Sequence, residues 1–151
     1  MPKKKKDIEY YGTVGRRKES SARVRLYIVS KKDKTAVVGS THIKQGDIVI
    51  NGKPLDVYFP LESERNIFMK PLVSVDCADR FAVSIVVRGG GKSGQLDAAV
   101  LGLARALCVV DETYRPTLKS LGFLTRDPRV RERRKVGKGG KARRQKQSPK
   151  R

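Results

Sequence analysis

The sequence has no tryptophan, a single histidine, two cysteines, and only 15 acidic residues against 35 basic ones. With His42 alone, no metal site or catalytic centre can be built on several histidines. Cys77 and Cys108 lack the Cys-x-x-Cys spacing of zinc and redox motifs. They indicate two buried thiols in a reducing compartment, with a disulfide as the alternative. Nucleophile-elbow and His-Glu-x-x-His motifs are also missing, so we expect no enzyme, no cofactor and no metal.

Long apolar runs are missing as well. We find none approaching the roughly 20 residues that cross a bilayer, and no apolar region follows the lysines at 3–6 as in a signal peptide. No membrane partner and no small-molecule substrate are therefore expected. The length fits one domain with a tail. We expect a mobile basic leader at 1–9, a globular α/β domain at 10–122 with an inserted loop or hairpin at 31–47, and an extended basic tail at 123–151.

Basic residues dominate the C-terminal end of the chain. Residues 126–151 contain 13 basic and 2 acidic residues, a net charge of +11, which leaves +9 of the total +20 on residues 1–125. Val130, Val136 and Ala142 are too few to bury an apolar face. A segment of this composition cannot form a core of its own. We therefore expect it to become ordered only against a polyanion such as folded RNA.

The alternative for this tail is a solvated, non-specific basic segment or a nuclear-import signal. The rest of the chain is also basic, which makes nucleic acid the leading class of partner and an anionic membrane surface the second. The tail lacks the Leu, Phe or Trp face of an interfacial helix. The composition thus favours nucleic acid.

Alternation indicates a half-buried strand at residues 22–28. Ala22, Val24 and Leu26 would face the core, while Arg23 and Arg25 face the other way beside the preceding Arg-Arg-Lys triplet. That basic face is either an RNA surface or an ordinary solvated strand face.

Other patterns predict the remaining elements. Strands are expected at 10–14, ended by Gly15, at 48–50 before an Asn-Gly turn, and at 81–87, with an extra short strand allowed at 35–38. Apolar spacing predicts a helix over 96–107 with Asp97 in its first turn. Shorter helices are expected at 53–59, at 62–69 before Pro71, and at 113–121 ended by Gly122.

A glycine-rich stretch at 89–95 joins the strand at 81–87 to the long helix. The Walker A pattern fails, because it requires glycine where Val86 stands. The pattern Gly-x-Gly-x-x-Gly is present, but no acidic ribose ligand follows in a second strand. Three interpretations remain: a structural tight turn, a contact to a phosphate backbone, and kinase-like nucleotide catalysis, which these failures disfavour.

Several of these stretches together resemble a known family. They occur in one order at 11–18, 21–25, 50–55, 58–60, 89–95, 104–107, 119–128, 132–135 and 141–144. The most specific is Lys-Ser-Leu-Gly-Phe-Leu-Thr-Arg-Asp-Pro at 119–128. As a set they resemble the bacterial type of small-subunit ribosomal protein nine.

The resemblance implies an α/β fold, an α+β two-layer sandwich. Its four-stranded sheet would carry helices on one face and a left-handed β-α-β crossover, against the usual right-handed sense, with a long extended basic C-terminal tail. It implies a structural constituent of the small ribosomal subunit that supports translation. The partners would be small-subunit ribosomal RNA (rRNA) in the head, neighbouring head proteins, and the anticodon stem-loop of peptidyl-site tRNA, in a cytoplasmic ribosome or, as the alternative, an organellar one.

Site residues follow from the resemblance together with the basic composition. The tRNA contacts would be Lys150 and Arg151, the terminal Lys-Arg of the family. The rRNA-binding residues would be Arg16, Arg17, Lys18, Arg23, Arg25, Gly89, Gly90, Gly91, Lys92, Ser93, Gly94, Gln95, Arg126, Arg129, Arg131, Arg133, Arg134, Lys135, Lys138, Lys141, Arg143 and Arg144.

Two departures from the family stand out. Residues 31–47 are about a dozen residues longer than the usual short turn, and Pro149 precedes the terminal pair where the family commonly has serine. Pro149 restricts Ser148 to extended geometry. The alternative function is a free-standing RNA-processing accessory subunit with a similar basic surface.

Overall fold

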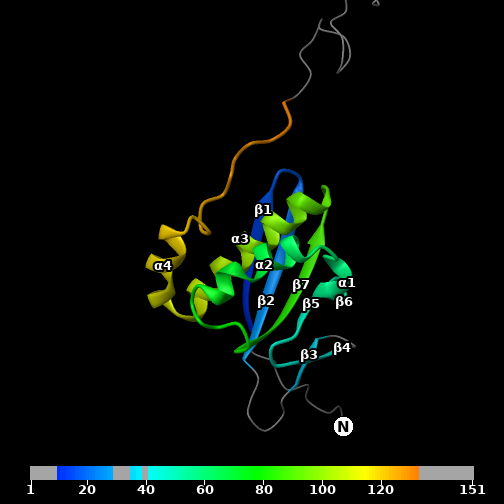
Figure 1. Cartoon of the computed structure of the whole chain (residues 1–151), viewed down its shortest axis with the longest axis vertical. Helices are drawn as coiled ribbons and strands as arrows, with labels where there is room; N and C mark the ends of the chain where they lie inside the picture. The colour runs from blue at the N-terminus through cyan, green and yellow to red at the C-terminus, as the bar shows by residue number, and fades with distance from the viewer. Residues whose placement is uncertain (1–9, 29–34, 39–40, 133–151) are drawn as a thin grey trace, which may run out of the picture.

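The computed structural model describes residues 10–28, 35–38 and 41–132 (Figure 1). Six of the seven strands in these residues precede the first helix along the chain. In chain order the elements are β1 Tyr10–Arg17, β2 Ser20–Ile28, β3 Thr35–Val38, β4 Thr41–Lys44, β5 Ile48–Ile50, β6 Lys53–Pro54, α1 Leu55–Tyr58, α2 Glu62–Val73, β7 Phe81–Arg88, α3 Lys92–Val110, the 3-10 helix η1 Glu112–Tyr114 and α4 Arg115–Ser120.

The main sheet is mixed, with strand order β1-β2-β7-β5-β6. All neighbours are antiparallel except β5 and β7, which are parallel and are joined through α1 and α2. The expected four strands are present, and a fifth is added: β6 pairs with β5 across a turn in which Asn51 and Gly52 both have positive φ. That is the geometry an Asn-Gly hairpin turn requires. The left-handed sense of the crossover stays a prediction.

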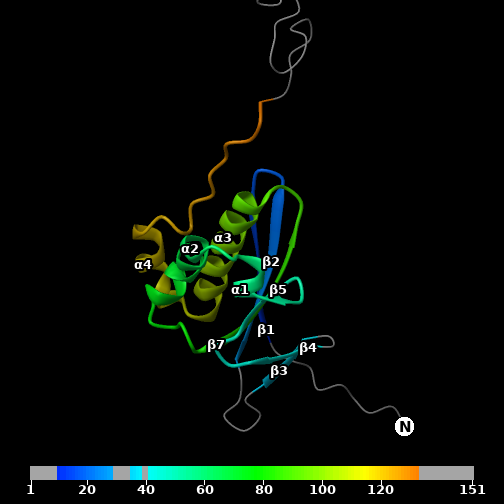
Figure 2. The same cartoon turned by 45° about the vertical axis from the view of Figure 1, so that its right-hand side comes forward.

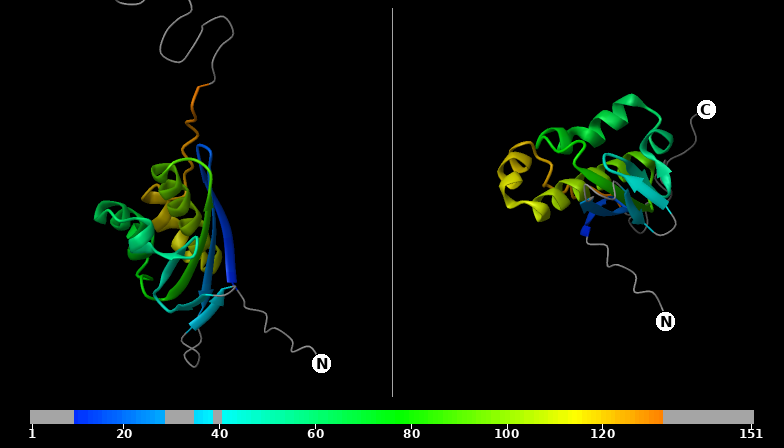
Figure 3. Two further views of the ribbon diagram at one scale, coloured as in Figure 1. Left: turned by 90° about the vertical axis from the view of Figure 1, so that its right-hand side faces the viewer. Right: turned by 90° about the horizontal axis from the view of Figure 1, so that it is seen from below.

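The helices lie on one face of this sheet (Figure 3). On β2, Ala22, Val24 and Leu26 are fully buried in the core, whereas Arg23 is exposed, so the predicted alternation is confirmed. The core continues on α3, where Leu103 and other apolar residues are buried. Burial of this shared face makes the sheet and α3 one rigid support.

Helix α3 is, by length and composition, able to cross a membrane, which corrects the expectation that no apolar run comes near that length. Most of it is buried inside the domain. It serves as the core helix, and its apolar residues are accounted for by packing on β1 and β2.

The segment at 35–44 forms a separate hairpin, with β3 antiparallel to β4. Ala36 and Ile43 of this hairpin bury themselves with Tyr27 and Ala82, which lie in the main sheet. The hairpin therefore covers one end of the sheet on the face opposite the helices (Figure 3). That second small core explains why β7 is buried on both faces.

Five expectations on element boundaries and burial were wrong. Lys53 and Pro54, expected at the start of a helix, form strand β6, and α1 begins only at Leu55. Strand β1 runs through Gly15 to Arg17, and α2 continues through Pro71, whose missing N–H falls in the last turn and costs one helical bond. Helix α3 begins at Lys92, so Asp97 lies in its second turn. The two cysteines are free thiols as favoured, but Cys108 is only half-buried.

Candidate nucleic-acid interface

Three groups of predicted site residues meet at one end of the domain. The β1–β2 turn, the loop between β7 and α3, and the start of the tail all lie there, in both views of Figures 1 and 2. The turn and the loop touch: Ser20 Oγ donates a hydrogen bond to Gly89 O at 3.1 Å, and a Cβ on Gly89 would lie 2.5 Å from Glu19 O. Segments about 70 residues apart in sequence are thus in direct contact.

The glycines of the loop have two different roles. Gly89 and Gly90 have φ of +74° and +61°, a region that favours glycine, and a Cβ on Gly90 would overlap Ser20 Oγ. Packing and backbone geometry therefore account for both. Gly91 instead faces open space and caps α3 without a side-chain hydrogen bond. Its surroundings leave the positive N-terminal end of a 19-residue helix accessible to an anion.

Residues 92–95, which the sequence analysis assigns to the glycine-rich loop, instead form the first turn of α3. Lys92 and Ser93 are exposed at this end. Gly94 is buried. The half-buried Gln95 side chain is already engaged in two hydrogen bonds and is not free to bind RNA.

A polar network behind the loop holds it in place. Asn51 exchanges two hydrogen bonds with the backbone of Val87, at 3.0 and 2.9 Å. The Tyr58 hydroxyl donates to Gln95 Oε1 at 2.7 Å, and Gln95 Nε2 donates to Gly89 O at 3.1 Å. The loop is therefore preorganised by side chains from the β5–β6 turn, α1 and α3. Sequence reasoning missed the roles of Asn51 and Tyr58. The Asn-Gly and Tyr-Phe-Pro motifs were the available signal.

The two arginines on the outer face of β2 differ in surroundings. Arg25 is half-buried, with its guanidinium carbon 4.7 Å from the centre of the Tyr10 ring. Tyr10 in turn lies 5.7 Å from the Tyr27 ring. Arg23 is exposed, opposite Val14 and Val86. Arg25 is thus held by a cation–π contact, while Arg23 extends from the sheet.

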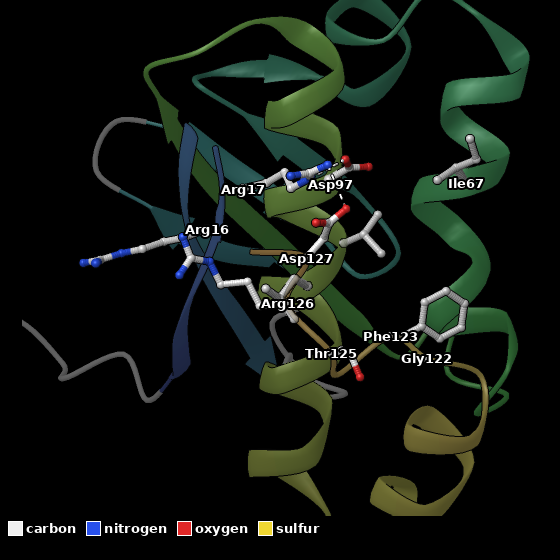
Figure 4. A pocket seen from close by; sticks show the side chains of 11 residues that line it. Arg16, Arg17, Ile67, Asp97, Gly122, Phe123, Thr125, Arg126 and Asp127 are labelled. Carbon is white, nitrogen blue, oxygen red and sulfur yellow. Dashed lines mark ion pairs between the residues drawn. The ribbon is translucent and has the colours of Figure 1, made fainter. Parts of the chain in front are cut away.

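Arg16 and Arg17 point to opposite sides of β1 (Figure 4). Arg16 is exposed and directed away from the domain. The Arg17 side chain is only 11 % exposed, because it is surrounded by acceptors: Nε lies 3.4 Å from Asp97 Oδ2, Nη2 lies 2.9 Å from Asp127 Oδ2, and Nη1 donates to Arg129 O at 2.6 Å. Sequence reasoning missed both aspartates as partners of Arg17.

Asp127 is held as a carboxylate by its neighbours. The hydrogen bonds from the Arg129 side chain, and then from its backbone N–H, are the main causes that lower the pKa of Asp127 far below its ordinary value. The charge of Arg17 lowers that pKa further. Conversely, Asp127 raises the pKa of Arg129. Asp127 therefore remains charged through the physiological range.

A hollow of about 260 Å³ lies beside this group (Figure 4). Val100 and Leu101 of α3 and Ile67 of α2 supply apolar lining, and Phe123 lies next to them. Arg16 and Arg126 border it on the basic side. Within the described residues, no group of three His, Cys, Asp or Glu side chains could hold a metal ion.

Some of the remaining predicted cations lie in the described part of the chain, and the others lie outside it. Arg126, Arg129 and Arg131 are exposed on the described start of the tail, and Lys18 is exposed in the β1–β2 turn. The leader at 1–9 and, within 31–47, residues 31–34 and 39–40 lie outside the described residues. So do the predicted site residues Arg133, Arg134, Lys135, Lys138, Lys141, Arg143, Arg144, Lys150 and Arg151.

Comparison with known protein families identifies the family of this chain. The family described as Ribosomal protein S9/S16 matches residues 15–151, which is most of the chain. The chain belongs to the ribosomal protein S9/S16 family. As a member of the S9/S16 family it is a structural protein of the small ribosomal subunit, with ribosomal RNA and ribosomal proteins as partners, and it is not an enzyme. The resemblance inferred from the motifs is confirmed, and kinase-like catalysis at the glycine loop is excluded.

Proposed function

We propose that this chain binds small-subunit rRNA in the head of the subunit through the end where the β1–β2 turn, the β7–α3 loop and the tail meet. The observation that carries the proposal is this convergence of exposed cations from three separate segments. Phosphate groups would lie against Arg16, Lys18 and Arg126, because exposed cations position a nucleic-acid backbone without reading its sequence. The same surface includes Arg23, Lys92, Ser93, Arg129 and Arg131.

The β7–α3 loop contributes a backbone site. Gly91 is open to solvent at the uncapped end of α3, and Lys92 and Ser93 flank it. Uncapped N–H groups at a helix start favour a phosphate oxygen. Gly89, Gly90, Gly94 and Gln95 support this site from behind, so the structural and the phosphate-binding interpretations of the loop apply to different residues.

The tail beyond the described residues completes the proposal. Arg133, Arg134 and the later cations would line a groove of rRNA, and the tip, Lys150 and Arg151, would contact the anticodon stem-loop of peptidyl-site tRNA in a cytoplasmic ribosome. Neighbouring head proteins would contact faces that RNA leaves uncovered. The support is the composition of the tail and the family's terminal Lys-Arg, which this chain retains after Pro149.

Deleting residues 149–151 tests the tip. We expect small subunits to assemble normally but to retain peptidyl-site tRNA less well and to keep the reading frame less accurately, because two cations leave the tRNA and none leaves the rRNA. Assembly is measured by gradient sedimentation, and tRNA retention by filter binding. A double Arg143→Gln, Arg144→Gln variant is the control, since it removes two charges from the rRNA-facing part instead. Loss of assembly in the deletion would refute the tip assignment.

Salt dependence tests the rRNA surface. For the isolated protein on a duplex rRNA fragment, the logarithm of affinity should fall with the logarithm of salt concentration by about 0.9 for each neutralised phosphate. Arg16→Gln should therefore reduce the slope by about one unit. A flat response of the unaltered protein would contradict the proposal. Co-sedimentation with small subunits at high salt separates it from a free-standing RNA-processing subunit.

A further inference from the structure

Arg17 uses all three nitrogens of its guanidinium for contacts within the protein. Its guanidinium joins three elements: β1 through its own backbone, α3 through Asp97, and the tail through Asp127 and the carbonyl of Arg129. Its side chain is 11 % exposed. A phosphate approaching it would also meet two carboxylates, since Asp97 and Asp127 lie against it.

We propose that Arg17, Asp97 and Asp127 form a clasp that fixes the direction in which the basic tail leaves the domain. Arg17 is then a positioning residue and not an RNA contact. The proposal refines the proposed function at one residue, and its main test needs no RNA.

The start of the tail is attached to the domain at two points, and two points fix the direction of the segment between them. The first is apolar: Phe123 and Leu124 pack against the core, and Phe123 N donates to Leu118 O at 3.1 Å. The second is the clasp, at Asp127 and Arg129. A segment held only at the first point could change direction at Thr125 and Arg126, which lie between the two points, whereas a segment held at both cannot.

The local sequence reinforces the clasp. Pro128 disfavours helical geometry at Asp127 and keeps the chain extended there. Arg129 folds back onto the same carboxylate, with its Nη2 2.6 Å from Asp127 Oδ2 and its backbone N–H donating to Asp127 Oδ1 at 2.9 Å. Asp127 is one of only two acidic residues after position 125. Its position in an otherwise cationic segment is explained by Arg17.

A guanidinium suits this position better than an ammonium group. Its planar fork presents several N–H donors in fixed directions. One side chain can therefore reach a carboxylate on α3, a second carboxylate on the tail, and a backbone carbonyl of the tail. Arg17→Lys would keep the charge but lose this simultaneous contact. The neighbouring Arg16, which is exposed and points away, provides a control with the same loss of charge.

The direct experiment measures backbone order in the free, full-length protein by 15N relaxation. In the unaltered protein, residues 127–131 should be nearly as ordered as the domain, with order parameters of about 0.85. In Arg17→Gln the order parameters of these residues should fall below about 0.6. Arg16→Gln should leave them unchanged, and Arg17→Lys should resemble Arg17→Gln. Unchanged order in Arg17→Gln would overturn the proposal.

Asp127→Asn provides a second variant, because its side chain lies on the tail and its loss leaves the domain core intact. It should loosen residues 127–131 as Arg17→Gln does, with an unchanged thermal midpoint of the domain. If both variants left the tail ordered, the clasp would be refuted even if one of them impaired folding.

RNA binding then separates positioning from contact. If the freed tail adopts the correct direction in about a tenth of its conformers, Arg17→Gln should weaken affinity for the rRNA fragment about tenfold while its salt slope stays unchanged. Arg16→Gln should reduce the slope. A slope reduced in Arg17→Gln, with the tail still ordered, would identify Arg17 as an RNA ligand. If no variant changes any slope, the proposed rRNA surface fails, while the order measurement still decides the clasp.

Discussion

At the scale of single residues, two glycines allow α3 to lie directly against the sheet. A Cβ on Gly15 would overlap Ala98 O and lie 2.5 Å from Gly102 N, and a Cβ on Gly102 would lie 2.7 Å from Val24 Cγ2. The Thr13 hydroxyl uses this closeness to donate to Gly102 O at 2.6 Å. Gly15 therefore permits close packing in the middle of β1, which is why it does not end the strand.

Gly15→Ala should destabilise the domain by about 2 kcal/mol or more, as overpacking against atoms that cannot move aside does. The atoms opposite Gly15 belong to the helix backbone, so relief requires α3 to shift. Urea unfolding measures the change in free energy. Gly91→Ala is the matched control, since its Cβ would meet open space, and it should stay within about 1 kcal/mol of the unaltered protein. Equal effects of the two substitutions would contradict this account.

At the scale of elements, the β3–β4 hairpin closes a surface that the helices leave open. Ile43 is 1 % exposed and packs with Tyr27 and Ala82, the latter two from the outer face of β2 and β7. Without the hairpin, this end of the sheet would expose the Tyr27 ring and Ala82 to solvent. The described part of the long 31–47 segment therefore has a structural role, because its apolar residues pack on the sheet.

Ile43→Ala should reduce the free energy of unfolding by about 2–4 kcal/mol, the usual range for truncating a buried isoleucine. Thermal or urea unfolding of the full chain measures it. The neighbouring Lys44→Ala removes an exposed side chain from the same strand and should change stability by less than about 0.5 kcal/mol. A negligible effect of Ile43→Ala would mean that the hairpin does not pack on the sheet in solution.

At the scale of the whole molecule, two acidic residues form ion pairs at the basic end of a strongly basic chain. The total is +20, yet Asp97 and Asp127 stand at the end where basic segments meet. Paired there with Arg17, they hold the tail against the domain, while Arg16, Lys18 and Arg126 remain exposed. Repulsion between the tail and the basic domain is thus offset at one point.

Acid titration should release the tail from the domain only well below the ordinary pKa of aspartate, about 3.9. The pKa of Asp127 is lowered in the folded protein, so its contribution is fully present above that ordinary value and is lost as the pH falls through the lowered pKa. The amide signal of Arg129, which bonds to Asp127 Oδ1, reports it by NMR. In Asp127→Asn that signal should report a free tail already at pH 7. A release midpoint near pH 4 would contradict the lowered pKa.

Local patterns determined much of this protein from the sequence alone. The period-2 alternation of β2, the helical spacing in α3, the Asn-Gly turn and the motif set that indicates the S9/S16 family each depend on residues close in the chain, whose backbone geometry sets the pattern. The cationic composition likewise indicated a nucleic-acid partner without any contact being known.

Only the tertiary structure decided which residues meet. Arg17 and Arg16 are equivalent in sequence, but Arg17 faces acceptors as far as 112 positions away, whereas Arg16 faces solvent. Gly15 and Gly89 likewise owe their identities to atoms of α3 and of the β1–β2 turn. Such contacts depend on how α3 and the tail pack on the sheet, and a one-residue change of position along β1 reverses which side of the sheet a side chain faces.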